Sequence, residues 1–186
     1  MPGMRTFRVA VVLLAFALTA CSSSDKPAPS ASASRTSSSV AKPDAAGALD
    51  PCTLVSADAV SKAISIPGLT SKPGPAEDNA ANGGKARSCE YLLNGKSAGA
   101  LAVTRYEGRQ AKPADMVAAI KKAKPGAQDV AGFPDGAVYY VDEQKTATLA
   151  AAKLISGTPV LVNYTGPTKM TAEMMTPLVK TALAAS

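Results

Sequence analysis

The chain has 186 residues, with 20 lysines and arginines, 14 aspartates and glutamates, and no histidine. Without histidine it lacks the usual general base near neutral pH and any nucleophile that an imidazole activates. Residues 49–186 carry 15 basic and 12 acidic side chains, and so small and dispersed a positive charge argues against nucleic acid as a partner.

Residues 1–20 have the three parts of a secretory signal peptide: Arg5 and Arg8, an apolar run over residues 9–18, and small residues before Cys21. Ten apolar residues are too few to span a bilayer, whose hydrocarbon core needs about 20 in a helix. The sequence Leu18-Thr19-Ala20-Cys21 resembles a bacterial lipobox, which implies cleavage before Cys21 and a diacylglycerol on its sulfur. The alternative is an ordinary signal peptide that is cleaved nearby, with Cys21 incidental.

Residues 21–48 consist of Cys21 and a stretch dominated by Ser, Ala, Pro and Thr, without apolar periodicity. Such a composition buries too little apolar surface to offset the entropy of ordering, so we expect a disordered tether. Two or three acyl chains would hold the protein firmly on a membrane. We therefore expect residues 49–186 to form one extracytoplasmic domain, lipid-anchored at the cell membrane.

The first half of this domain is predicted to contain one helix and one hairpin. Ser56 is a suitable N-cap for a helix over Ala57–Ile64. Residues 70–85 are rich in Gly, Pro, Asn and Ala, which indicates a long exposed loop. Two strands then flank a hairpin turn at residues 94–97, and they are expected at Arg87–Leu93 and Gly99–Tyr106.

A second helix is predicted over Ala114–Lys122, because Pro113 is favoured at the first helical position. A cluster of three lysines, Lys121, Lys122 and Lys124, falls in its last turn, where cations complement the helix dipole. The alternative is that this cluster contacts anionic lipid head groups.

The second half is predicted to contain three strands and a final helix. Short turns join strands at Gly136–Asp142, Thr146–Ile155 and Pro159–Thr165, so neighbouring strands must be antiparallel. An apolar stripe with Met174 and Met175 predicts a helix within Thr171–Ala184, and Pro177 either starts this helix or kinks it. The stripe is either core packing or one wall of an adaptable apolar groove.

These elements predict a single α+β domain in the order α-β-β-α-β-β-β-α. We expect an antiparallel sheet of about five strands packed with three helices that cover one face.

Cys52 and Cys89 favour a disulfide over a metal site. Their spacing fits no zinc pattern, and without histidine a metal would have to be held by these thiolates and carboxylates. Disulfides persist outside the cytoplasm. In the chain-entropy model this one would stabilise the fold by about 4 kcal/mol and join the start of the first helix to the first strand.

No motif predicts a catalytic residue, a metal ligand or a cofactor. Gly95-Lys96-Ser97 is similar to the end of a phosphate-binding loop, but Glu90 stands where that loop needs its first glycine, so a hairpin turn is the better interpretation. Asp142 and Glu143 are adjacent, and their side chains should diverge at a strand end rather than share a proton.

The segment Asp50-Pro51-Cys52-Thr53-Leu54-Val55, followed later by Cys89-Glu90-Tyr91, resembles the actinobacterial lipoproteins grouped as domain of unknown function 3558. These proteins open with Asp-Pro-Cys and carry a second Cys followed by one residue and an aromatic. Residues 130–137 are similar to a Gly-x-Gly-Asp-x-Ala stretch of the same lipoproteins. The resemblance implies that the two cysteines pair and that the domain is extracytoplasmic. It implies no catalytic residue, because the family has no established activity.

The sequence therefore predicts a non-enzymatic, membrane-anchored module that binds a protein or a cell-wall partner. The alternative is a carrier or sensor of a small apolar ligand, held in a cavity between the sheet and the last helix. A deep apolar pocket behind Met174 and Leu178 would favour this alternative, and a filled core would count against it.

Overall fold

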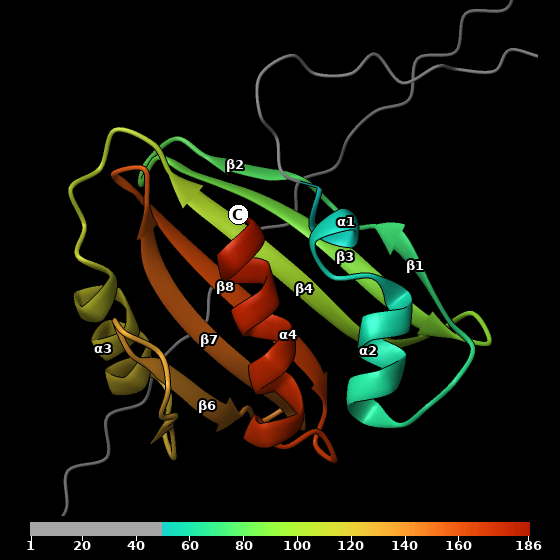
Figure 1. Cartoon of the computed structure of the whole chain (residues 1–186). Helices are drawn as coiled ribbons and strands as arrows, with labels where there is room; N and C mark the ends of the chain where they lie inside the picture. The colour runs from blue at the N-terminus through green and yellow to red at the C-terminus, as the bar shows by residue number, and fades with distance from the viewer. Residues whose placement is uncertain (1–49) are drawn as a thin grey trace, which may run out of the picture. The chain divides into compact units, whose positions relative to one another are not determined.

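The computed structural model describes residues 50–186 (Figure 1). The predicted signal peptide, the lipidation of Cys21 and the tether lie outside the described residues. The described part contains four helices and one sheet of eight strands. The helices are α1 (Pro51–Leu54), α2 (Ala57–Ile64), α3 (Pro113–Ala123) and α4 (Ala172–Ala185). The strands are β1 (Leu69–Pro73), β2 (Glu77–Asn79), β3 (Gly84–Leu93), β4 (Lys96–Tyr106), β5 (Gln128–Asp129), β6 (Ala137–Val141), β7 (Thr146–Ile155) and β8 (Thr158–Pro167).

The sheet has the order β1-β3-β4-β8-β7-β6-β5, with β2 paired to β3 beside β1, and every pairing is antiparallel. Two tight hairpins fix its register. In each turn both central residues have positive φ, at Asn94 and Gly95 between β3 and β4, and at Ser156 and Gly157 between β7 and β8. This left-handed pair matches the twist of the flanking strands. The four helices and the antiparallel pairings of the described residues confirm the predicted α+β class.

The five predicted strands are present as β3, β4, β6, β7 and β8, but the expected number of strands was wrong. The region predicted as a long exposed loop, residues 70–85, contains most of β1 and all of β2, and β5 is a further short strand. These three strands pair on one side only, at the edges of the sheet, and most of their side chains are exposed. Edge strands tolerate polar residues and proline, which is why no apolar alternation marks them.

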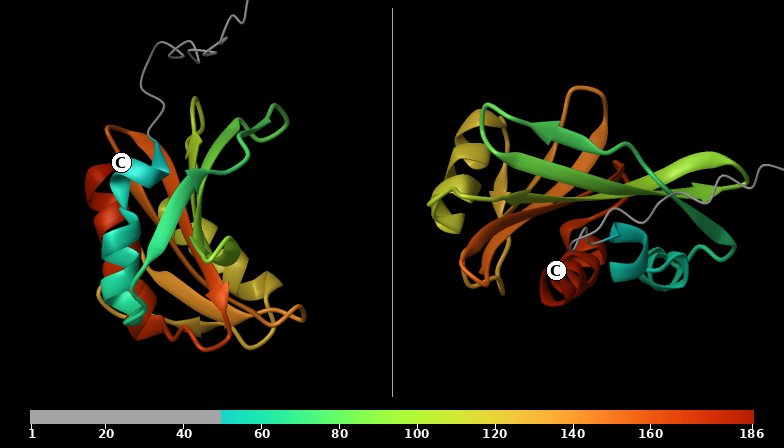
Figure 2. Two further views of the ribbon diagram at one scale, coloured as in Figure 1. Left: turned by 90° about the vertical axis from the view of Figure 1, so that its right-hand side faces the viewer. Right: turned by 90° about the horizontal axis from the view of Figure 1, so that it is seen from above.

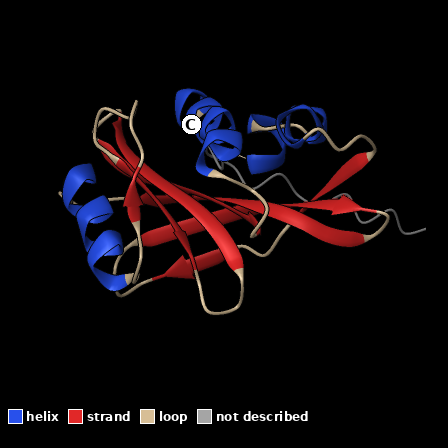
Figure 3. Cartoon of the chain, turned by 90° about the horizontal axis from the view of Figure 1, so that it is seen from below, coloured by secondary structure: helices blue, strands red, loops and turns tan. Residues whose placement is uncertain are grey.

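The helices cover both faces of the sheet, which corrects the prediction that they lie on one face (Figures 2 and 3). Along β7, Ala147, Leu149 and Ala151 belong to the core under α1, α2 and α4, whereas Ala150 and Ala152 pack with α3 on the opposite face. The near-continuous apolar run of β7 is the signal of a strand buried on both faces.

The helix predictions hold in most details. Helix α2 spans the predicted residues, and Ser56 Oγ accepts a hydrogen bond from the Ala59 amide as its N-cap. Helix α3 carries Lys121 and Lys122 in its last turn, as expected. Helix α4 begins at Ala172 and runs through Pro177, which excludes a start at Pro177. The fourth helix, α1, was missed because it has only four residues, held by an Asp50 cap and Pro51 at its first position.

The main core contains two stacked tyrosines whose hydroxyl groups differ. Tyr91 and Tyr164 are fully buried, and their ring centroids lie 6.0 Å apart. Tyr91 Oη donates a hydrogen bond of 2.7 Å to the Val55 carbonyl, whereas Tyr164 Oη has no hydrogen-bond partner within the described structure. Burial raises the pKa of both hydroxyl groups, so both stay protonated at neutral pH.

We expect Tyr91→Phe to lower the free energy of unfolding by about 1–3 kcal/mol, because it leaves the buried Val55 carbonyl without its donor. Tyr164→Phe is the matched control, since it keeps the stacked ring and removes a hydroxyl that has no partner. It should leave stability unchanged or raise it. Urea unfolding of both variants measures the difference, and equal losses would contradict this assignment.

Candidate functional site

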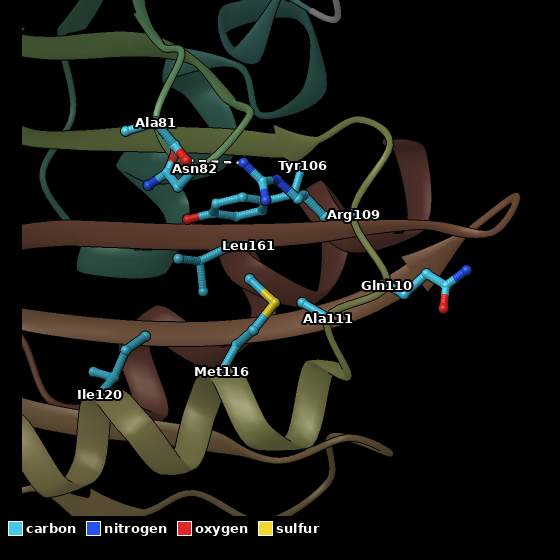
Figure 4. A pocket seen from close by; sticks show the side chains of 9 residues that line it. All are labelled: Ala81, Asn82, Tyr106, Arg109, Gln110, Ala111, Met116, Ile120 and Leu161. Carbon is cyan, nitrogen blue, oxygen red and sulfur yellow. Dashed lines mark hydrogen bonds between the residues drawn. The ribbon is translucent and has the colours of Figure 1, made fainter.

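The first candidate site is a hollow between α3, the end of β4 and the turn before β3, which we call the Tyr106 pocket (Figure 4). Its volume is about 480 Å³. In the close-up, Met116 and Ile120 rise from α3 toward the ring of Tyr106, and Arg109 lies across the other side of that ring. The residues that line it come from five segments: Ala81, Asn82, Tyr106, Arg109, Gln110, Ala111, Met116, Ile120 and Leu161.

Two consecutive glycines, Gly83 and Gly84, leave space for the side chains of Tyr106 and Arg109, which line one side of the pocket. A Cβ on Gly84 would lie 3.1 Å from the Tyr106 ring, and a Cβ on Gly83 would lie 3.2 Å from Arg109 Nε. Gly83 also has a φ of 70°, in the left-handed region. Arg109 Nη2 donates a hydrogen bond of 2.8 Å to the Ala81 carbonyl, which fixes the guanidinium at the rim.

The acidic groups beside the Tyr106 pocket already have cationic partners. Lys85 Nζ lies 2.6 Å from Glu107 Oε2, and Arg87 Nη1 lies 2.7 Å from Asp78 Oδ1. The hydrogen bond from Lys85 lowers the pKa of Glu107, and the hydrogen bond from Arg87 lowers the pKa of Asp78. Arg109 takes part in none of the ion pairs of the described residues, so its charge remains available at the rim.

The pocket opens beside a part of the sheet that no helix of residues 50–186 covers (Figure 3). Helix α3 packs mainly on β7, with further contacts to β6 and β8. The same face of β3 and β4 is left half-exposed. We call this surface the open face, and its small side chains are Ser88, Ala100, Ala102, Thr104, Asn163 and Thr165. An apolar pocket with a few polar groups at its rim is the usual form of a ligand-binding or active site, and here it is continued by a surface of small residues.

The second candidate site is an apolar hollow of about 570 Å³ beside the start of α4, which we call the Met174 pocket. It lies between the end of α2, the β3–β4 hairpin and the segment that joins β8 to α4. Seven of its lining residues are apolar and four are polar: Ile64, Ile66, Leu93, Ala98, Pro167, Met170 and Met174, with Asn94, Lys96, Ser97 and Lys169.

A third hollow, of about 360 Å³, lies between the end of α3 and the β6–β7 turn and is lined by Asp142 and Glu143. Asp142 Oδ1 accepts a hydrogen bond of 2.8 Å from the Thr146 amide, so its carboxylate belongs to the turn. At its other side, Lys124 Nζ lies 5.4 Å from the centroid of the Tyr140 ring. Within residues 50–186, no group of three acidic, Cys or His side chains is arranged to hold a metal ion.

The structure joins the two predicted cysteines, and it places the residues of the predicted apolar stripe in different surroundings. Cys52 of α1 and Cys89 of β3 form a disulfide with their Cα atoms 5.1 Å apart, as predicted. In the apolar stripe of α4, Met175 and Leu178 are buried in the core, whereas Met174 is half-buried and lines a pocket. The core interpretation therefore holds for Met175 and Leu178, whereas a pocket of the kind that the alternative requires lies beside Met174.

Sequence reasoning missed Tyr106, Arg109 and the glycine pair at 83–84 as site residues. The only local signal was an aromatic residue at a strand end, followed by Gly108 and a basic residue. Lys96 was considered only as part of a turn, and it does lie in the hairpin, but it also lines the Met174 pocket. Lys96 lines this pocket because α2 and α4 pack near the hairpin, and no local sequence pattern predicts that packing.

Comparison with known proteins gives one result. The family model described as protein of unknown function (DUF3558) matches residues 16–161, which is most of the chain. No curated protein and no solved structure matches. None of the four helices in the described part of the chain has the length and hydropathy of a membrane span.

Proposed function

We propose that this chain, which belongs to the DUF3558 family of proteins of unknown function, is a non-enzymatic binding module. In this proposal a lipid on Cys21 anchors it to the outer face of the cell membrane. In this proposal the Tyr106 pocket and the open face receive a protein or a cell-wall partner. The tether predicted from the composition of residues 22–48 would let the domain reach a partner on the order of 30 Å from the membrane.

The location rests on sequence and on the disulfide. The apolar run followed by Leu18-Thr19-Ala20-Cys21 is the arrangement of a lipoprotein signal. The Cys52–Cys89 disulfide supports an extracytoplasmic compartment, because structural disulfides are rare where glutathione keeps thiols reduced.

The observation that carries the binding role is the Tyr106 pocket. Its floor is apolar, and an aromatic ring and a guanidinium stand at its rim. Tyrosine and arginine are enriched at the centre of binding interfaces, because each combines a large contact surface with directional hydrogen bonding. Burial raises the pKa of Tyr106, so its hydroxyl remains a hydrogen-bond donor at neutral pH.

Site-directed photo-crosslinking of the full chain in its own cells tests this role. A benzophenone amino acid placed at Gln110, an exposed rim residue, should give adducts of discrete mass. The same amino acid at Lys153, which is exposed on β7 and outside the pockets described, should give far less. Tyr106→Ala with Arg109→Glu should abolish the Gln110 adducts, and Cys21→Ser should release the chain from the membrane.

The chemistry of the adduct identifies the class of partner. Adducts that a muramidase shortens contain cell-wall glycan, and adducts that a protease shortens contain a second protein. Equal yields at Gln110 and Lys153 would contradict a binding site at the Tyr106 pocket.

A second candidate function is a carrier or sensor of a small apolar ligand, and the Met174 pocket is the observation that favours it. Its volume of about 570 Å³ lies within the range of roughly 300–1,000 Å³ that is usual for small-molecule sites. Leu178 is buried in the core and does not line this pocket, so of Met174 and Leu178 only Met174 lies beside it.

A further inference from the structure

We infer that the Met174 pocket binds a single-chain amphiphile with an anionic head group, whose tail enters the pocket while Lys96 and Lys169 hold the head. The inference rests on the second candidate function, the carrier, and names the chemical class of its ligand. It does not depend on partner binding at the Tyr106 pocket.

The walls of the pocket select an alkyl chain. Ile64 closes the pocket from α2, and Leu93 and Ala98 close it from the β3–β4 hairpin. Met170 contributes from the β8–α4 connection and Met174 from the start of α4. Ile66, which also lines the pocket, is 39% exposed and so presents an apolar surface to solvent. Among these lining residues no carboxylate is present to oppose an apolar tail or a negative head.

The two methionines make the pocket adaptable. Methionine has three rotatable bonds and fits apolar groups of irregular shape. Met170 lies directly against Gly166, where any larger residue would collide with its sulfur. Met174 is half-buried, whereas the neighbouring Met175 is locked in the core. A tail can therefore be accommodated by movement of Met174 and of Met170, which lies at the edge of the core.

The charge at the rim selects the head group. Lys96 comes from the hairpin and Lys169 from the β8–α4 connection, so two lysines from separate segments line the same pocket. Neither lysine is a member of the four ion pairs found among residues 50–186. By contrast, Lys85 and Lys121 each have a carboxylate partner. Two lysines that have no ion-pair partner in the described part of the chain, and that line an apolar hollow, are complementary to a carboxylate or phosphate on an alkyl chain.

Methyl NMR of methionine-labelled residues 21–186 carrying Cys21→Ser tests the inference with laurate as the probe. This chain has four methionines, Met116, Met170, Met174 and Met175. Laurate should shift the Met170 and Met174 methyl signals saturably. The signal of Met116, which lines the Tyr106 pocket, should stay in place and serves as the internal control.

Affinity measurements then distinguish the contribution of the alkyl tail from that of the anionic head group. Lengthening the fatty acid should raise affinity about fourfold for each methylene until the pocket is full. Lys96→Glu with Lys169→Glu should weaken laurate binding at least tenfold, whereas Lys153→Glu, an exposed lysine outside the pocket, should change it less than twofold. Laurate and dodecyl phosphate should both bind more tightly than dodecanol.

Each outcome has a definite meaning. If dodecanol and laurate bind equally and the lysine variants change nothing, the anionic preference is wrong but the carrier function stands. If neither probe shifts Met170 or Met174, both the inference and the carrier function fail. A shift confined to Met116 would place the ligand in the Tyr106 pocket and overturn the inference.

Discussion

We expect the Cys52→Ala, Cys89→Ala double variant to have a free energy of unfolding about 4 kcal/mol lower than the parent chain. The disulfide closes a segment with a sequence separation of 37 residues, and the chain-entropy model gives this magnitude for a loop of that length. The bond joins α1 to β3, and Cys89 is fully buried beneath that helix. Urea unfolding monitored by far-ultraviolet circular dichroism measures the difference.

Reduction of the parent chain is the matched control for this prediction. It breaks the same bond without removing the sulfur atoms, so any packing effect of the two substitutions appears as the difference between the reduced parent and the double variant. A loss below about 1 kcal/mol in both samples would show that the loop is already held by α1, which Asp50 caps through the Cys52 amide.

Gly99→Ala should lower the free energy of unfolding by about 1–3 kcal/mol, the usual cost of overpacking a core. Gly99 is buried on β4, and a Cβ there would lie 2.7 Å from Tyr164 Oη and 2.8 Å from the Thr165 carbonyl oxygen. The carbonyl belongs to the neighbouring strand β8, so it cannot move without disturbing the ladder between β4 and β8. Thermal unfolding compared with the parent chain measures the loss.

Gly166→Ala is the control for Gly99→Ala. Gly166 is also buried in the sheet, but a Cβ there would meet the Met170 side chain rather than neighbouring backbone. Because Met170 lines the Met174 pocket, its flexible side chain can rotate into that space. Gly166→Ala should therefore cost clearly less than Gly99→Ala, and the reverse order would contradict the packing described for both glycines.

The central strands and hairpins could be predicted from the sequence because their signals are local. Asn94-Gly95 and Ser156-Gly157 supply the left-handed turn residues, and the apolar residues on either side supply the strands. The edge strands β1, β2 and β5 could not be predicted in this way. They are short, exposed and polar, and they form only because β3 and β6 offer unpaired backbone groups.

The pockets could be predicted only in part, because they form between segments that are far apart in the chain. Met174 was a candidate since it lies on an apolar stripe, yet the pocket beside it also needs Leu93 from β3 and Pro167 from β8. Tyr106 and Arg109 become a site only when Gly83 and Gly84 are folded against them. Positions of this kind depend on tertiary packing, which local propensity does not encode.

The most direct test of the proposed binding role is the yield of crosslinked adduct from Gln110 in living cells, measured with the parent pocket and with Tyr106→Ala. The proposal predicts discrete adducts in the parent chain and their loss in the variant, with the membrane-bound amount of protein unchanged. Adducts of equal yield with and without the Tyr106 ring would contradict it.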